Sequence, residues 1–104
     1  MEVIFKERYL QELYHTGKTD KKHRYQPQVV RKYIRVIDIM VDTPDVTGLL
    51  RYNSLNYEKL KGDKAGLSFV RVNDQYRIEF EEQVKDGETV ATICHITDLS
   101  NHYK

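Results

Sequence analysis

The sequence predicts a small α+β domain in which helices near the amino end pack on one face of a small antiparallel sheet. Between residues 27 and 42, apolar residues recur at three- and four-residue steps, which is the spacing of an amphipathic helix. From residue 67 onward the period of the apolar residues changes to two, which is typical of strands. Helices followed by a run of strands indicate segregated layers. The 104 residues contain no repeat and no linker rich in proline or glycine, so we expect one domain over residues 1–104.

The amino-terminal segment is predicted to form a short strand and then a short helix. The segment over residues 2–5 is short and apolar enough to form an edge strand. Tyr9, Leu10 and Leu13 follow at helical spacing, and Gly17 interrupts the pattern. A basic, polar connection leads from there to the next helix.

The strongest helical pattern covers residues 27–42. Pro27 suits the first position of a helix, because the N–H that proline lacks would have no partner there. The helix is predicted to end before Pro44, since the residue that precedes a proline avoids helical geometry. The following residues, 45–64, are predicted to be irregular.

Three strands joined as a meander are predicted in the carboxyl-terminal third, over residues 67–72, 76–82 and 88–97. If residues 73–75 form the first loop, Arg71 lies opposite Arg77. That register also gathers five apolar side chains on one face: Val70, Val72, Tyr76, Ile78 and Phe80. A slip by one residue would move every side chain to the other face, so the hydrophobic pattern selects this register.

The predicted register places two arginines opposite each other on the face away from the helices. Like charges in directly opposite positions destabilise a strand pair. An anion bound between Arg71 and Arg77 would relieve this repulsion. An ion pair with Glu79, two residues after Arg77, would relieve it as well, and the sequence leaves both explanations open.

The charge is unevenly distributed, although the net charge is only +1. Residues 1–35 carry nine Lys and Arg against four Asp and Glu, and residues 51–77 carry six against three. Basic patches of this kind can bind phosphate while the total charge stays near neutral.

Several classes of protein and site are not expected from this composition. No apolar run approaches the roughly 20 residues that cross a bilayer, and the single cysteine, Cys94, cannot form an internal disulfide or a cysteine-rich zinc site. We expect no metal, no cofactor and a cytoplasmic location. His95, beside Cys94, is expected to be a packed or hydrogen-bonded core histidine.

Two segments resemble a known family. Leu60-Lys61-Gly62-Asp63, followed by Phe-Val-Arg-Val-Asn-Asp-Gln-Tyr-Arg-Ile at residues 69–78, resembles the HigB branch of the RelE/ParE toxins. Those proteins carry a Leu-Lys-Gly turn, an Ile/Val-Arg-Val-Asn strand end and a Trp/Tyr-Arg-Ile strand start. The closing residues 96–104 also resemble the tail of relatives in that branch. The predicted order of helices and strands is similar to the RelE-like fold over nearly the whole chain.

The resemblance implies a toxin of a type II toxin–antitoxin pair. Such a toxin acts as a ribosome-dependent, metal-independent mRNA endonuclease (an mRNA interferase) that inhibits translation, and the ribose 2′-hydroxyl attacks the adjacent phosphate. The implied partners are a cognate HigA-like antitoxin, mRNA on the ribosome and rRNA, with operator DNA reached only through the antitoxin. The sequence leaves two alternatives open: a ParE-like toxin that inhibits gyrase, and a non-catalytic member that binds only antitoxin and operator.

By the same resemblance, the expected site combines basic side chains with groups that move protons. Arg77 is expected to stabilise the charge of the transition state. Proton transfer is expected from His102 or Tyr103 at the tail, or from Glu58, which stands where the family often has a histidine. Glu58 could instead pair with Lys61. The remaining RNA phosphates are expected to contact Lys59, Lys61, Lys64 and Arg71.

Overall fold

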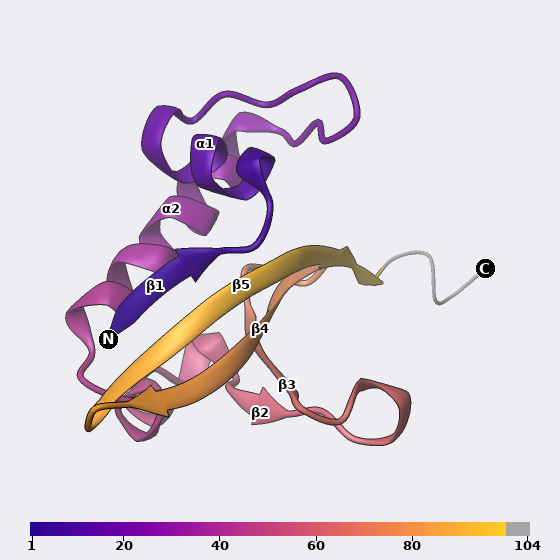
Figure 1. The fold of residues 1–104 in the computed structure, drawn as a ribbon. Helices are drawn as coiled ribbons and strands as arrows, with labels where there is room; N and C mark the ends of the chain where they lie inside the picture. Colours follow the sequence, from indigo (N-terminus) through magenta and orange to yellow (C-terminus); the bar gives the residue numbers. More distant parts are fainter. Residues whose placement is uncertain (100–104) are drawn as a thin grey trace.

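A computed structural model describes residues 1–99, which form a five-stranded sheet with helices on one side (Figure 1). The helices and strands follow in the order β1 (Glu2–Phe5), α1 (Arg8–Thr16), α2 (Pro27–Asp42), β2 (Glu58–Lys59), β3 (Leu67–Arg71), β4 (Tyr76–Lys85) and β5 (Glu88–Asp98). Three 3-10 helices lie between α2 and β3: η1 (Val46–Arg51), η2 (Asn53–Leu55) and η3 (Gly62–Lys64). No helix in this part of the chain is long and apolar enough to span a membrane.

The predicted α+β architecture is confirmed, and the strand order in the sheet is β1-β5-β4-β3-β2. The three carboxyl-terminal strands form the predicted antiparallel meander. The sheet is nevertheless mixed rather than wholly antiparallel, because β1 runs parallel to β5, with Val3 opposite Ala91. Parallel neighbours need a long connection, and here nearly the whole chain lies between them.

The core lies between the helices and one face of the sheet. Six residues of α2 are buried: Val29, Val30, Tyr33, Val36, Ile37 and Met40. They pack in one cluster with inward residues of the strands, among them Val70, Ile78, Phe80 and Ile93. The hydroxyl of Tyr33 donates a hydrogen bond of 2.8 Å to the carbonyl oxygen of Leu10, which fixes α1 against α2. The opposite face of the sheet is not covered by α1 or α2, and we call it the open face.

The helix ends and the first hairpin follow the sequence closely. α1 ends at Gly17, whose φ of 71° is the left-handed conformation that favours glycine at this position. α2 begins at Pro27 as predicted. In the hairpin, Arg71 lies opposite Arg77, and the N–H of Val72 donates to the carbonyl of Tyr76 at 3.0 Å. The predicted register is therefore confirmed.

A β-bulge interrupts the pairing of β4 with β5. Glu79 lies opposite His95, whereas the next residue, Phe80, lies opposite Ile93, so that Cys94 is the extra residue. Without an extra residue, Ile93 and His95 would point to the same face of the sheet. With it, Ile93 joins the core and His95 lies on the open face. His95 is hydrogen-bonded as expected, but its side chain is 42% exposed rather than buried in the core.

Candidate functional site

Two rows of side chains cross the open face, since residues directly opposite in neighbouring strands share a face. The first row consists of Glu58 on β2, Phe69 on β3, Glu79 on β4 and His95 on β5. The second row consists of Arg71, Arg77 and Thr97. The meander thus brings a carboxylate, two guanidinium groups and an imidazole together from three strands.

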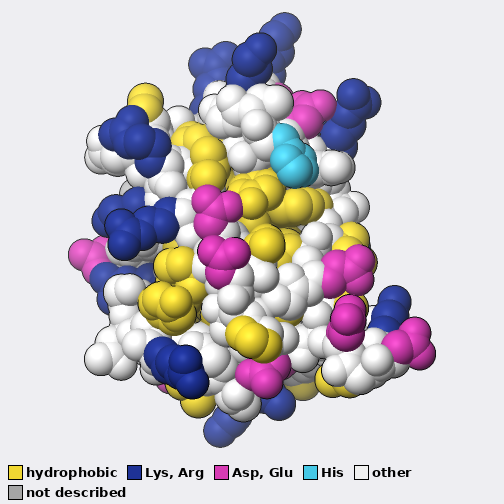
Figure 2. Space-filling view, turned by 90° about the vertical axis from the view of Figure 1, so that its left-hand side faces the viewer, with side chains coloured by type: hydrophobic (Ala, Val, Ile, Leu, Met, Phe, Trp, Pro, Cys, Tyr) yellow, Lys and Arg dark blue, Asp and Glu magenta, His cyan; other side chains and the backbone are white. Residues whose placement is uncertain are grey.

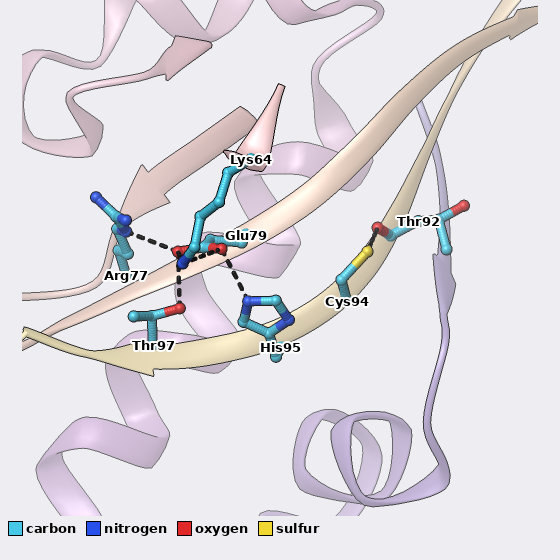
Figure 3. A network of polar contacts seen from close by, with 7 residues as sticks. All are labelled: Lys64, Arg77, Glu79, Thr92, Cys94, His95 and Thr97. Carbon is cyan, nitrogen blue, oxygen red and sulfur yellow. Dashed lines mark hydrogen bonds and ion pairs between the residues drawn. The ribbon is translucent and has the colours of Figure 1, made fainter. Parts of the chain in front are cut away.

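Glu79 is the centre of this arrangement (Figure 3), and its side chain is completely buried. Four side chains donate hydrogen bonds to its carboxylate: Lys64 Nζ at 3.1 Å from both oxygens, Arg77 Nε at 2.9 Å, His95 Nε2 at 2.8 Å and Thr97 Oγ1 at 2.8 Å. We call these five residues the Glu79 cluster. Buried carboxylates are stable only when they are paired in this way.

The Glu79 cluster carries a net positive charge. Burial by itself raises the pKa of Glu79, but the hydrogen bonds from its neighbours outweigh this effect and lower the pKa to about 2. Glu79 is therefore ionised at any physiological pH. Its single negative charge faces the positive charges of Lys64 and Arg77, so an excess positive charge remains at the surface.

Arg77 is held in one orientation. Its Nε donates to Glu79, and its guanidinium carbon lies 4.8 Å from the centre of the Phe69 ring. Within residues 1–99 its two terminal nitrogens have no hydrogen-bond partner, and in Figure 3 they point away from the carboxylate. These nitrogens carry four N–H groups in a planar fork, which is the geometry that binds phosphate.

Arg71 and Arg77, which lie opposite each other, are each paired with a carboxylate. Arg77 pairs with Glu79, and Arg71 pairs with Asp74 and donates from Nε to the carbonyl of Asn73 at 3.1 Å. Each arginine therefore has an ion pair that relieves the repulsion. Arg71 is 44% exposed at the side chain, so it can still contact a ligand on the open face.

The remaining predicted residues are distributed around this centre. Lys64 belongs to the Glu79 cluster, and Lys61 lies exposed at the start of η3. Glu58 is exposed on β2, and it makes no ion pair with Lys61 in the described part of the chain. Lys59 lies opposite Ser68, on the side of the sheet that faces the helices, so it does not join the other basic residues.

The sequence predicted two site residues that the structure does not describe, and it missed three residues that belong to the Glu79 cluster. His102 and Tyr103 lie outside the described residues. The central role of Glu79 and the participation of His95 and Thr97 were not predicted. The alternation of side chains along β5 puts Thr97 on the same face as Arg77, so the sequence pattern could have identified Thr97. The extra residue Cys94 breaks this alternation, so the pattern could not identify His95.

A groove lies between α2, η2 and the end of β3, with a volume of about 280 Å³. Its lining contains three basic residues and no acidic one, beside apolar and hydroxyl side chains: Lys32, Arg35, Val36, Ile39, Tyr52, Ser54, Leu55, Arg71 and Val72. Figure 2 shows the side of the molecule with α2 and β1, where Lys and Arg lie around much of the outline and hydrophobic side chains lie exposed in the middle. Among the exposed hydrophobic residues are Ile4 of β1 and Val41 of α2.

The chemistry that these groups support is anion binding together with proton transfer. The open face offers guanidinium and ammonium groups fixed by a buried carboxylate, and an imidazole bonded to the same carboxylate. Within residues 1–99, no group of three or more His, Cys, Asp or Glu side chains could hold a metal ion.

Comparison with known families gives one match, which covers residues 3–94. The matching family is described as the RelE-like toxin of the type II toxin–antitoxin system HigB. A search of curated proteins finds no significant match.

Solved structures with the same fold include three bacterial proteins. The chain is 8% identical to YafQ from Escherichia coli strain BL21(DE3), with a TM-score of 0.60, and the match covers 99% of this chain and 98% of YafQ. It is 16% identical to a YoeB/ParE toxin from Agrobacterium tumefaciens, with a TM-score of 0.57 and coverage of 94% and 98%. It is 20% identical to a chain of the YoeB–YefM complex from Staphylococcus aureus, with a TM-score of 0.54 and coverage of 93% and 94%. At these identities the likeness concerns the fold.

Proposed function

The chain belongs to the family of HigB toxins, which are RelE-like toxins of type II toxin–antitoxin systems, and from this premise we propose that it is an endoribonuclease that cuts mRNA on the translating ribosome. The observation that carries the proposal is the orientation of Arg77. A buried carboxylate holds its Nε while its terminal nitrogens have no partner among residues 1–99. A substrate on the ribosome places the protein in the cytoplasm.

The proposed reaction needs little more than charge neutralisation and proton transfer. The ribose 2′-hydroxyl attacks the adjacent phosphate, and negative charge develops on the phosphate oxygens. Hydrogen-bond donors that are fixed before the reaction stabilise this charge without reorganising. Arg77 supplies such donors from its terminal nitrogens, and Lys64 supplies a second positive charge beside the same carboxylate. No step requires a metal ion.

The flanking basic residues are proposed to bind the RNA backbone on either side of the cut. Lys61 and Arg71 are both exposed, one at the start of η3 and the other at the end of β3. Lys59 points to the other side of the sheet, so we leave it out of this set. Glu58, His102 and Tyr103 stay predictions for proton transfer.

The proposed inhibitor is a HigA-like antitoxin, just as the YoeB of Staphylococcus aureus forms a complex with YefM. The basic groove between α2, η2 and β3 suits a segment in which an apolar side chain is flanked by carboxylates. Its floor supplies Val36, Ile39 and Leu55, and its rim supplies Lys32 and Arg35. Complementary charge of this kind favours fast and specific association.

The groove gives a prediction about antitoxin binding. Arg35→Glu is expected to weaken binding of the cognate antitoxin by about 10-fold, because it introduces a like charge opposite the carboxylates. Titration calorimetry at two salt concentrations measures the affinity and its salt dependence. Lys85→Glu, an exposed site at the end of β4, makes the same charge change as a control. Equal weakening in both variants would show that the effect is one of net charge and not of the groove.

The test of the proposed function is cleavage of an mRNA in a purified translation reaction, mapped by primer extension. We expect cuts within the translated region of the wild-type reaction. We expect none when the start codon of the same mRNA is removed, and none when the antitoxin is added. Intact mRNA in every reaction, with a toxin that still binds its antitoxin, would contradict the proposal. A gyrase-cleavage assay would then test the ParE-like alternative.

A further inference from the structure

We propose that His95 is the general base that removes the proton from the attacking 2′-hydroxyl, and that Glu79 is the positioning residue that holds it. This inference rests on the proposed function, since it assigns the proton acceptor of the same cleavage. It is distinct from the prediction for the tail, because both residues lie within the described strands.

The hydrogen bond between the two side chains determines which nitrogen of His95 can accept a proton. Nε2 lies 2.8 Å from Oε1 of Glu79. An ionised carboxylate can only accept hydrogen bonds, so the proton of the neutral imidazole lies on Nε2. The other ring nitrogen, Nδ1, then carries the free electron pair. A carboxylate that fixes the tautomer of a histidine in this way makes the opposite nitrogen a defined base.

The position of His95 allows RNA to reach it. Its side chain is 42% exposed, whereas that of Glu79 is completely buried and cannot touch a substrate. The ring is one hydrogen bond away from the carboxylate that also holds Arg77 and Lys64 (Figure 3). The proton acceptor and the groups that bind the phosphate are therefore fixed to the same anchor.

The other histidines of residues 1–99 lie elsewhere. His15 is exposed on α1 and contacts the rings of Phe5 and Tyr14. His23 stacks on Tyr9 with ring centres 3.5 Å apart and pairs with Asp20. Neither contacts a basic side chain of the Glu79 cluster, so His95 is the histidine of this part of the chain that can act beside Arg77.

The proposed step is a transesterification. The 2′-oxygen forms a bond to phosphorus while its proton moves to Nδ1 of His95. The bond between phosphorus and the 5′-oxygen breaks, and the leaving 5′-oxygen takes a proton from water. The products are a 2′,3′-cyclic phosphate and a 5′-hydroxyl end, and the imidazolium of His95 returns its proton to solvent.

Two substitutions separate the chemistry from binding and folding. The amide nitrogen of His95→Gln can still donate to Glu79, but the side chain cannot carry a proton. Single-turnover cleavage of mRNA in preformed ribosome complexes is expected to slow by about 100-fold, the lower end of the effect of a general base. Binding of the toxin to the ribosome is expected to change less than about 2-fold. His15→Gln is the matched control and should cut at the wild-type rate.

The pH profile gives a readout that a structural role would not change. The wild-type rate should fall on acidification, because a general base must be unprotonated to accept a proton, and His95→Gln should lack this fall. Glu79→Gln should keep this fall but cut more slowly, because the amide no longer requires the proton of the imidazole to lie on Nε2. The charged residues on the elements next to His95 are Arg77 and Glu81 on β4, Lys64 at the end of η3 and Lys6 after β1.

The outcomes distinguish this inference from the function on which it rests. His95 is supported as the base if His95→Gln cuts slowly, shows no fall in rate on acidification and binds the ribosome normally. Wild-type cleavage by His95→Gln would overturn it and leave the endonuclease in place. A wild-type protein that cuts no RNA would overturn both. Melting temperatures show whether each variant is folded, and partial rescue of His95→Gly by added imidazole tests the same role if His95→Gln is unstable.

Discussion

Replacement of Arg77 by alanine is expected to lower the rate of RNA cleavage by about 1,000-fold, in line with the loss of a fixed donor to a developing oxyanion. The expectation follows from the contacts of the guanidinium group. Its Nε donates to Glu79 and its guanidinium carbon lies over the Phe69 ring, so the terminal nitrogens are fixed before a substrate binds. Arg77→Lys keeps the positive charge but cannot bond the carboxylate and present a planar fork at the same time. We therefore expect Arg77→Lys to be slow as well, with at least a 10-fold loss.

The experiment compares the cleavage rates of purified variants on ribosome-bound mRNA with their melting temperatures. Arg31→Ala, at an exposed position of α2, is the control for the loss of one arginine. The fold should persist in Arg77→Ala, since Glu79 keeps Lys64, His95 and Thr97 as partners. A folded Arg77→Ala variant that cuts mRNA at the wild-type rate would show that this guanidinium does not act on the transition state.

The stability of the wild-type protein is expected to fall by about 3 kcal/mol as Glu79 becomes protonated, at 1.4 kcal/mol for each unit by which the pKa differs from its ordinary value. The pKa of Glu79 is about 2 in the folded protein, against an ordinary value of 4.5. A lowered pKa means that the folded state prefers the ionised carboxylate. The stabilisation is therefore complete above about pH 5 and is lost as the pH falls from there to about 2.

Urea unfolding at several pH values between 7 and 3 measures this loss. Glu79→Gln keeps the size of the side chain but does not titrate, so its free energy of unfolding should vary less with pH over this range. It should also be less stable at pH 7, because Lys64 and Arg77 lose the charge that they face. Parallel pH curves for the two proteins would mean that Glu79 is not the group that titrates in this window.

Sequence patterns predicted the local structure and the two arginines of the site. The helix over residues 27–42 and the hairpin register were predictable because both depend on apolar residues at fixed spacing. The opposition of Arg71 and Arg77 followed directly from that register.

The remaining features depend on contacts that the local pattern does not encode. The parallel pairing of β1 with β5 joins the two ends of the described chain. Lys64 reaches Glu79 from a separate 3-10 helix, 15 residues earlier in the chain. The predicted roles of His102 and Tyr103 stay predictions, since both lie outside the described residues.

The bulge at Cys94 has a consequence for how such proteins diverge. Because Cys94 is the extra residue, a relative that lacks it would pair regularly through this stretch and would still place the histidine opposite Glu79. Relatives aligned position by position across this strand would then compare side chains from opposite faces of the sheet. Side chains in this strand are better compared by their partners on β4 than by their positions in an ungapped alignment. A histidine absent from one column of an alignment can still occupy the same place in space.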